Sequence, residues 1–240
     1  MTTPKIVSPG EWLAARVKLL EKEKQLTRLH DELANERRQL PWVRVDKPYT
    51  FEGRQGKLSL SELFAGKSQL AVWHFMLGPG WKEGCPSCSM LADHVNGALP
   101  HLAARDVEYV AISRAPYAEI AAFQARMGWK FNWVSSHDSD FNRDFRVSFT
   151  KEELARGELD YNYGKIVFPS EEAPGLSAFA RDADGAIYHT YSTYARGAEP
   201  LLSVYALLDM MPKGRDEASL PWPMAWVRHH DRYGQAGETA

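Results

Sequence analysis

The stretch that most constrains the fold lies at residues 70–90 and reads LAVWHFMLGPGWKEGCPSCSM. Its first part, residues 70–77, is a continuous apolar run with strand-forming side chains, which predicts a buried β-strand. The Gly-Pro-Gly at 78–80 ends that strand. The only two cysteines of the chain follow at 85 and 88, where a helix-like segment begins. A close cysteine pair in this context indicates redox or metal chemistry.

Composition narrows the class of protein. Of the 240 residues, 44% are apolar and 25% charged, with a formal net charge of −2, which is typical of an ordinary globular core. This charge does not favour nucleic-acid or membrane-surface partners. The first 25 residues lack the apolar centre of a signal peptide, and no apolar run approaches the roughly 20 residues that span a bilayer. We therefore expect a cytoplasmic protein, in which two cysteines are not a structural disulfide framework.

Residues 8–39 are predicted to form one long helix. Ser8 is placed as the N-cap, Pro9 as the first helical residue and Glu11 as the partner of Ser8 in a capping box. Apolar side chains then recur every seven residues, at Trp12, Leu19, Leu26, Leu33 and Leu40. This narrow stripe either lies along its own domain or docks on a second subunit, so a homodimer is one of two expectations.

The remaining chain alternates strand and helix signals before it ends in a hairpin. We expect a kinked helix at 86–104, a strand at 107–113, a helix at 116–127 and a strand at 131–134. A long irregular region, 136–175, with a small helical piece at 151–156, precedes a hairpin of strands 176–181 and 186–191 and a closing helix at 199–211. This order predicts an α/β fold, a central mixed sheet flanked by helices with a long N-terminal helical arm. The expected divisions are the arm at 1–44, the main domain at 45–215 and an aromatic tail at 216–240.

The pattern resembles the thioredoxin superfamily. More narrowly, the phrases GCPSCSMLADHVNG, MGWKFNWVSSHDSDFNRDF, YHTYSTYARG and WVRHHDRYG look like a bacterial thioredoxin-like family often labelled dithiol-disulfide oxidoreductase. The resemblance covers nearly the whole chain and implies a thioredoxin-like fold with a redox-active C-x-x-C pair.

Two positions depart from the related families. Peroxiredoxins place Thr or Ser three residues before the reactive cysteine, where this chain has Lys82. Thioredoxins place a cis-proline before the hairpin strand, and matching Phe179 and Asp182 to that strand puts Leu176 there, with Pro174 two residues earlier. These departures weaken the expectation of a standard thioredoxin groove or peroxide pocket.

The position of the cysteines suggests distinct roles. Free N–H groups and the dipole at a helix start favour the thiolate that attacks disulfides or peroxides. Our hypothesis is that Cys85 is the nucleophile and Cys88, one turn further, the resolving thiol. Lys82 could lower the pKa of the Cys85 thiol or be a solvated loop lysine. Trp81 and Pro86 are auxiliary candidates.

Other interpretations of the pair stay open. The two thiols could be buried and inert, or could bind zinc together with His94 and His101. A c-type haem is excluded because Ser89 stands where a histidine is needed. His189 is expected to be a packed strand residue, and His229 and His230 form a weak metal pair. We predict neither cofactor nor metal.

The sequence thus favours a thiol-disulfide oxidoreductase. Its partners would be a protein or small-molecule disulfide or peroxide and a cellular thiol reductant, without nucleic acid or membrane. The alternatives are a thiol peroxidase-like enzyme and a non-catalytic redox sensor or binding protein of the same fold. An enzyme turns over, whereas a sensor reacts once and changes its shape or partner.

Overall fold

The computed structural model describes residues 4–234. The chain divides into two compact units, Met1–Pro41 and Trp42–Ala240, each of which is described by itself.

The first unit consists of one helix, α1 (Pro9–Arg38). Its start confirms the predicted capping box: the Ser8 hydroxyl accepts a hydrogen bond from the Glu11 N–H at 3.3 Å, and the Glu11 carboxylate accepts one from the Ser8 N–H at 3.0 Å. Among the described residues of this unit, none of the side chains of α1 is buried, so the helix carries an exposed apolar stripe.

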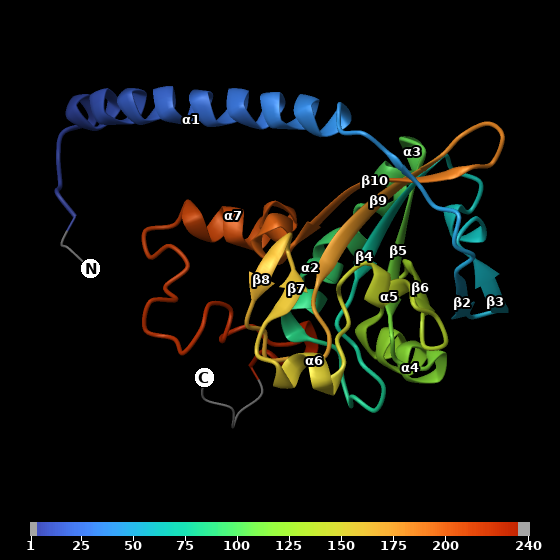
Figure 1. Cartoon of the computed structure of the whole chain (residues 1–240). Helices are drawn as coiled ribbons and strands as arrows, with labels where there is room; N and C mark the ends of the chain where they lie inside the picture. Colours follow the sequence, from blue (N-terminus) through green and yellow to red (C-terminus); the bar gives the residue numbers. More distant parts are fainter. Residues whose placement is uncertain (1–3, 235–240) are drawn as a thin grey trace. The chain divides into compact units, whose positions relative to one another are not determined.

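The second unit is built on an eight-stranded sheet with the order β1-β10-β9-β4-β5-β6-β2-β3 (Figure 1). Strands β4, β5 and β6 are parallel, and the other neighbouring pairs are antiparallel. The bounds are β1 (Val43–Arg44), β2 (Thr50–Gly53), β3 (Gly56–Ser59), β4 (Gln69–His74), β5 (Val107–Ser113), β6 (Asn132–Ser135), β9 (Gly175–Arg181) and β10 (Ile187–Tyr194).

Helical segments and a small second sheet complete this unit. The helical segments are η1 (Glu62–Phe64), α2 (Pro86–Asn96), α3 (Leu99–Ala104), α4 (Tyr117–Met127), α5 (Phe141–Asp144), α6 (Lys151–Ala155), η2 (Ala195–Leu201), α7 (Ser203–Asp209) and η3 (His230–Arg232). Strands β7 (Leu159–Tyr161) and β8 (Gly164–Ile166) form a separate hairpin. The four strands β5-β4-β9-β10, with helices between β4 and β5 and after β10, make the predicted thioredoxin-like core.

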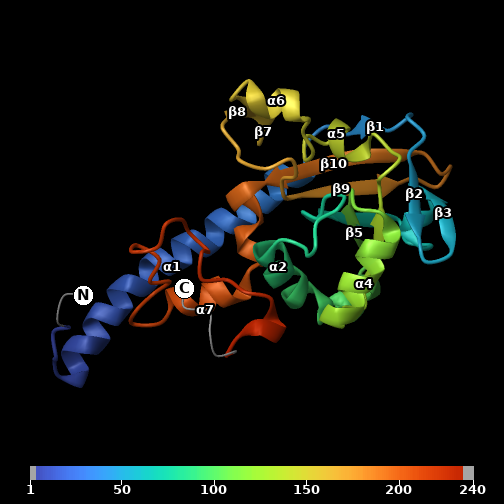
Figure 2. The ribbon, with the colours of Figure 1, turned by 90° about the horizontal axis from the view of Figure 1, so that it is seen from below.

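The sheet separates two apolar clusters. Figure 2 shows α2 and α4 on one side of β9 and β10, and α5 and α6 on the other. Neighbouring residues of β4 alternate between the clusters, because successive strand side chains point to opposite faces: Trp73 packs with the α2 and α4 side, Val72 with the η1 and α5 side. Both cysteines belong to the first of these faces.

A row of polar side chains crosses three strands on the face away from the cysteines. His74 Nε2 lies 2.8 Å from Ser177 Oγ, which lies 2.7 Å from Ser192 Oγ, and His189 Nε2 is also 2.7 Å from Ser192 Oγ. Burial lowers the pKa of His74 to about 3, so this imidazole is neutral. His189 is a half-buried strand residue, as predicted.

Three local predictions were wrong. The expected kinked helix at 86–104 is two helices, because Gly97 caps α2 and Pro100 lies in the first turn of α3. The expected helix at 199–211 is a 3-10 turn followed by α7, since Pro200 lacks the N–H that an α-helix needs. The helical piece predicted within the region 136–175 is confirmed as α6, but the rest of that region is not irregular throughout, because it also contains α5 and the β7–β8 hairpin.

None of the helices in residues 4–234 combines the length and the apolar composition needed to cross a membrane.

Candidate functional site

Cys85 is the N-cap of α2, and Pro86 is the first helical residue, where its missing N–H costs no hydrogen bond. The backbone of Cys85 is held on both sides. Its N–H donates to the carbonyl of Met76 at 3.0 Å, and its carbonyl accepts from the N–H and the hydroxyl of Ser89, each at 2.9 Å. The side chain is partly exposed, whereas Cys88 is only 2% exposed. Both are free thiols.

The surroundings of the two thiols shift their pKa values in opposite directions. A hydrogen bond from the Cys88 thiol lowers the pKa of Cys85 to about 7, helped by the N–H groups of Cys88 and Ser87 against the opposing effect of burial. Burial, followed by the adjacent Cys85 sulfur, raises the pKa of Cys88 well above its usual range. At neutral pH about half of Cys85 is thus a thiolate, while Cys88 keeps its proton.

An apolar cavity of about 400 Å³ opens beside both sulfurs. The strands, α2, η2 and the C-terminal segment all contribute to its walls, which include Trp73, Met76, Leu91, Phe168, Leu202 and Trp222. The Tyr161 hydroxyl supports the wall by donating to the Pro174 carbonyl at 2.6 Å and accepting from the Ala195 N–H at 3.1 Å. A cavity of this size and lining suits a small, largely apolar molecule.

A second cavity of about 330 Å³ also touches Cys85, and charged side chains contribute to its lining. Its walls include Trp81 and Pro86, together with Arg228, His229 and Arg232 of the C-terminal segment. Two of the auxiliary candidates therefore lie at the site. Lys82 is exposed and is not among the groups that shift the pKa of Cys85.

The residues that match the cis-proline loop have an unusual arrangement. No cis peptide bond occurs between residues 4 and 234. Leu176 pairs with Trp73 in the β4–β9 ladder, whereas Pro174 lines the apolar cavity beside the cysteines. Pro174, and not Leu176, therefore lines the cavity beside the two cysteines.

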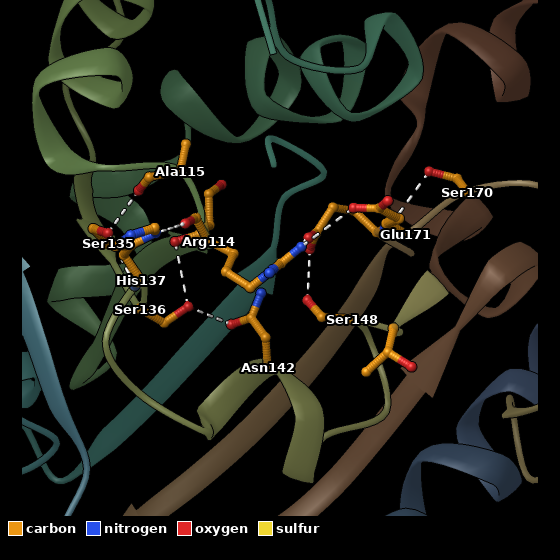
Figure 3. A network of polar contacts seen from close by, with 12 residues as sticks. Arg114, Ala115, Ser135, Ser136, His137, Asn142, Ser148, Ser170 and Glu171 are labelled. Atoms are coloured by element: carbon orange, nitrogen blue, oxygen red, sulfur yellow. Dashed lines mark hydrogen bonds and ion pairs between the residues drawn. The ribbon is translucent and has the colours of Figure 1, made fainter. Parts of the chain in front are cut away.

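Next to this loop the structure buries an ion pair that the sequence did not indicate. Glu172 is 1% exposed, accepts a hydrogen bond from Arg114 Nε at 2.7 Å and another from the Ser148 hydroxyl at 2.6 Å. Figure 3 shows Arg114 and Ser148 within this network at the end of β5. Burial raises the pKa of Glu172. A Cβ on Gly78 would lie 3.3 Å from the Glu172 side chain and 2.9 Å from Trp81, so the pair supports the loop that carries the cysteines.

The C-terminal segment also reaches the site, which is one of the positions that the sequence left open for the aromatic tail. His229 is buried and lies 2.8 Å from the Gly84 carbonyl oxygen. His230 instead lies 2.7 Å from a carboxylate oxygen of Asp93. The sequence indicated these two histidines only through the phrase WVRHHDRYG and as a weak metal pair, not through these contacts.

The zinc interpretation finds no support in the described part of the chain. Residues 4–234 contain no group of three or more His, Cys, Asp and Glu side chains placed to hold a metal ion. Burial also lowers the pKa of His94, one of the two histidines that this interpretation requires.

Comparisons with known proteins complete the description of the site. A model of the family described as "Bacterial protein of unknown function (DUF899)" matches residues 1–233. No curated protein matches the chain.

Solved structures with a similar fold include a variant of peroxiredoxin Q from Xanthomonas campestris. Its sequence is 18% identical to this chain, the match covers 68% of this chain and 91% of that chain, and the TM-score is 0.44. Peroxidoxin BcpB from Mycobacterium tuberculosis is 14% identical, the match covers 68% of this chain and 94% of that chain, and the TM-score is 0.46. A mitochondrial 2-cys peroxiredoxin from Plasmodium falciparum has 14% identity, 70% and 91% coverage and a TM-score of 0.41. These similarities assign no activity to this chain.

Proposed function

Because the chain belongs to DUF899, a family of bacterial proteins of unknown function, we propose its activity from the geometry of the site: it is a thiol oxidoreductase with Cys85 as nucleophile and Cys88 as resolving thiol. The observation that carries this proposal is the placement of the two thiols at the start of α2: Cys85 is partly exposed at the N-cap and Cys88 is buried one turn further, and their pKa values shift in opposite directions. A lowered pKa suits the attacking sulfur, and a buried protonated thiol one turn away suits the second step.

The first step with a disulfide forms a bond between the Cys85 sulfur and one substrate sulfur, and the other substrate sulfur leaves as a thiolate. Cys88 then loses its proton and attacks the Cys85 sulfur, which releases the second substrate thiolate and leaves a Cys85–Cys88 disulfide. Two electrons pass from the protein to the substrate. A cellular dithiol returns them by the same exchange in reverse.

The apolar cavity supports a small acceptor in preference to a folded protein. Both sulfurs lie in a cavity of about 400 Å³ whose walls come from segments far apart in the sequence. An apolar substituent on the acceptor would fill this cavity and leave the S–S bond beside Cys85.

A redox titration with thiol trapping and intact-mass readout tests the proposal. The parent should show a reversible two-electron Cys85–Cys88 couple. With a small aromatic disulfide, Cys88→Ser should stop at a mixed disulfide on Cys85, while Cys85→Ser should not react. A mixed disulfide that is trapped in Cys85→Ser but not in Cys88→Ser would show that Cys88 is the nucleophile and Cys85 the resolving thiol. A couple that forms once but is never re-reduced by dithiols would indicate the redox sensor.

Peroxide reduction is the second candidate, and the partial exposure of Cys85 beside a small cavity favours it. The thiolate would attack one peroxide oxygen, breaking the O–O bond to give a sulfenic acid and an alcohol or water. Condensation with the Cys88 thiol would then release water and form the disulfide. Sulfenic acid trapping in Cys88→Ser, and the relative rates with cumene hydroperoxide and the aromatic disulfide, separate the two candidates.

We also propose that α1 mediates a homodimer. Its row of Trp12, Leu19, Leu26 and Leu33 is exposed, and a lone helix with such a stripe gains stability by packing against another surface. Light scattering should give a dimer mass for the parent and a monomer mass for the double variant Leu19→Glu, Leu26→Glu. A monomer mass for the parent protein would contradict the proposed homodimer.

A further inference from the structure

The five residues 228–232, here called the C-terminal clasp, lie against the loop that leads into Cys85. η3 of the clasp contacts α2. Arg232 pairs with Glu83, and Arg126 of α4 lies between Glu83, at 3.2 Å, and Asp231, at 2.8 Å. The clasp is thus tied by ion pairs to the residues just before the cysteine pair, although some 145 positions separate them in sequence.

His229 makes the innermost contact of the clasp. Its Nε2 lies 2.8 Å from the Gly84 carbonyl oxygen, and because a carbonyl only accepts, Nε2 carries a hydrogen and donates it. Its Nδ1 faces the Arg126 guanidinium at 3.2 Å and the Glu83 carboxylate at 3.0 Å. The residue is 4% exposed, so these contacts are shielded from water and geometrically restricted.

Gly84 has no freedom to move away from this contact. A Cβ at this position would lie 2.5 Å from the Phe75 ring and 2.7 Å from the Phe123 ring. The His229 ring packs against the Phe123 ring with centroids 5.2 Å apart. The Gly84 peptide is therefore confined between aromatic side chains, with its carbonyl directed at His229.

The contact reaches Cys85 through a single rigid group. The Gly84 carbonyl and the Cys85 N–H belong to the same planar peptide unit. His229 holds the oxygen end of this unit, and the Met76 carbonyl accepts from the N–H end at 3.0 Å. The plane of this peptide and the φ of −57° at Cys85 together set the direction in which the Cys85 side chain leaves the backbone, and so the position of its sulfur at the start of α2.

From this geometry we infer that His229 is a positioning residue for Cys85: its hydrogen bond to the Gly84 carbonyl holds the peptide that leads into Cys85, and so keeps the sulfur at the N-terminus of α2. The inference rests on the proposed role of Cys85 as the nucleophile. Without the bond, the sulfur can move away from the N-terminus of α2, where the helix dipole favours an anion, and the thiolate is less stabilised.

Two variants with amide side chains distinguish the effect of the hydrogen bond to the Gly84 carbonyl from the effect of packing by the His229 side chain. The Gln side chain places its amide nitrogen near Nε2 of histidine, so His229→Gln keeps a donor for the Gly84 carbonyl. The shorter amide of His229→Asn reaches only the position of Nδ1. The neighbouring His230→Asn is the matched control, because His230 is partly exposed and contacts Asp93. All variants keep Cys88, whose high pKa leaves Cys85 as the thiol modified below pH 9.

The readout is the rate of iodoacetamide modification of Cys85 against pH, with the site identified by peptide mass, together with the melting temperature. We expect His229→Asn to raise the apparent pKa of Cys85 by about one unit or more, which lowers its thiolate fraction at pH 7 by about fivefold. At a pH where Cys85 is fully ionised in both proteins, the rate of modification of His229→Asn should equal that of the parent protein. His229→Gln and His230→Asn should keep the parent profile.

An unchanged profile in His229→Asn, with only a lower melting temperature, would overturn the inference and leave His229 a structural residue. Equal shifts in His229→Asn and His230→Asn would overturn it as well. A parent Cys85 with an ordinary pKa and no reversible couple would instead refute the proposed function. The two failures are therefore distinguishable in one set of measurements.

Discussion

Arg114 donates a hydrogen bond at 2.7 Å to Glu172, whose carboxylate is almost completely buried beside the cysteine loop. A buried ion pair is sensitive to the loss of one partner, because the remaining charge is left without compensation.

Arg114→Met should therefore lower the free energy of unfolding by about 3–5 kcal/mol near pH 8. Burial already raises the pKa of Glu172, and losing the cation raises it further. The folded state then keeps a proton that the unfolded state releases, so stability falls as the pH rises above the unfolded pKa of Glu. Urea unfolding at pH 5 and pH 8 should show a smaller loss at pH 5. The exposed Arg143→Met is the control and should change stability by less than about 0.5 kcal/mol.

Two glycine substitutions should have opposite outcomes. Gly84→Ala places a Cβ within 2.7 Å of two aromatic rings, and overpacking of this kind costs about 1–3 kcal/mol. Gly97→Ala meets nothing within 4 Å at a helical backbone conformation, so it should be neutral or stabilising by up to about 1 kcal/mol. Thermal unfolding compares them directly. Equal melting temperatures would contradict the packing described around Gly84.

Cys88 should also influence the pKa of Cys85. Cys88→Ala removes the thiol hydrogen bond that is the largest contribution to the lowered pKa of Cys85, so the apparent pKa should rise above 7. Cys88→Ser keeps a hydroxyl donor and should shift it less. The pH profile of iodoacetamide modification measures both, and a fall in the pKa of Cys85 in Cys88→Ala would show that the bond is absent.

Tyr161→Phe should weaken the wall of the apolar cavity. The substitution leaves the Pro174 carbonyl and the Ala195 N–H without their partner, at a cost of about 1–3 kcal/mol. The rate with an apolar disulfide should fall more than the rate with a small polar one. Tyr163→Phe is a suitable control, because Tyr163 is 79% exposed and does not line this cavity.

The parts of the fold that depend on neighbouring residues were predictable. Ser8 and Glu11 signal the start of α1, Pro86 the start of α2, and Gly128 the end of α4 with φ of 67°. The alternation of strand and helix patterns was enough to predict the central sheet, because each element carries its own periodicity.

The rest depends on contacts between distant residues. The β7–β8 hairpin turns at Asn162 and Tyr163, both with positive φ, and a tyrosine there gives little turn signal. The contact of His229 with Gly84 spans the domain, and the burial of Glu172 depends on Arg114. Matching Phe179 and Asp182 to the thioredoxin hairpin strand also put Leu176 at the proline position, whereas the β4–β9 register and the cavity lining place Pro174 beside the cysteines.

The polar row of His74, Ser177, Ser192 and His189 has a consequence for the choice among possible sheets. A slip of β9 by one residue against β4 or β10 would turn Ser177 to the opposite face of the sheet. His74 and Ser177 would then be buried without their partners in this row, at about 1–3 kcal/mol each, whereas Ser192 would keep its contact with His189. Apolar side chains tolerate such a slip better, since any apolar neighbour is nearly equivalent to another. This polar row therefore disfavours sheets in which β9 is out of register. It favours the register of β9 that brings Pro174 to the cysteines.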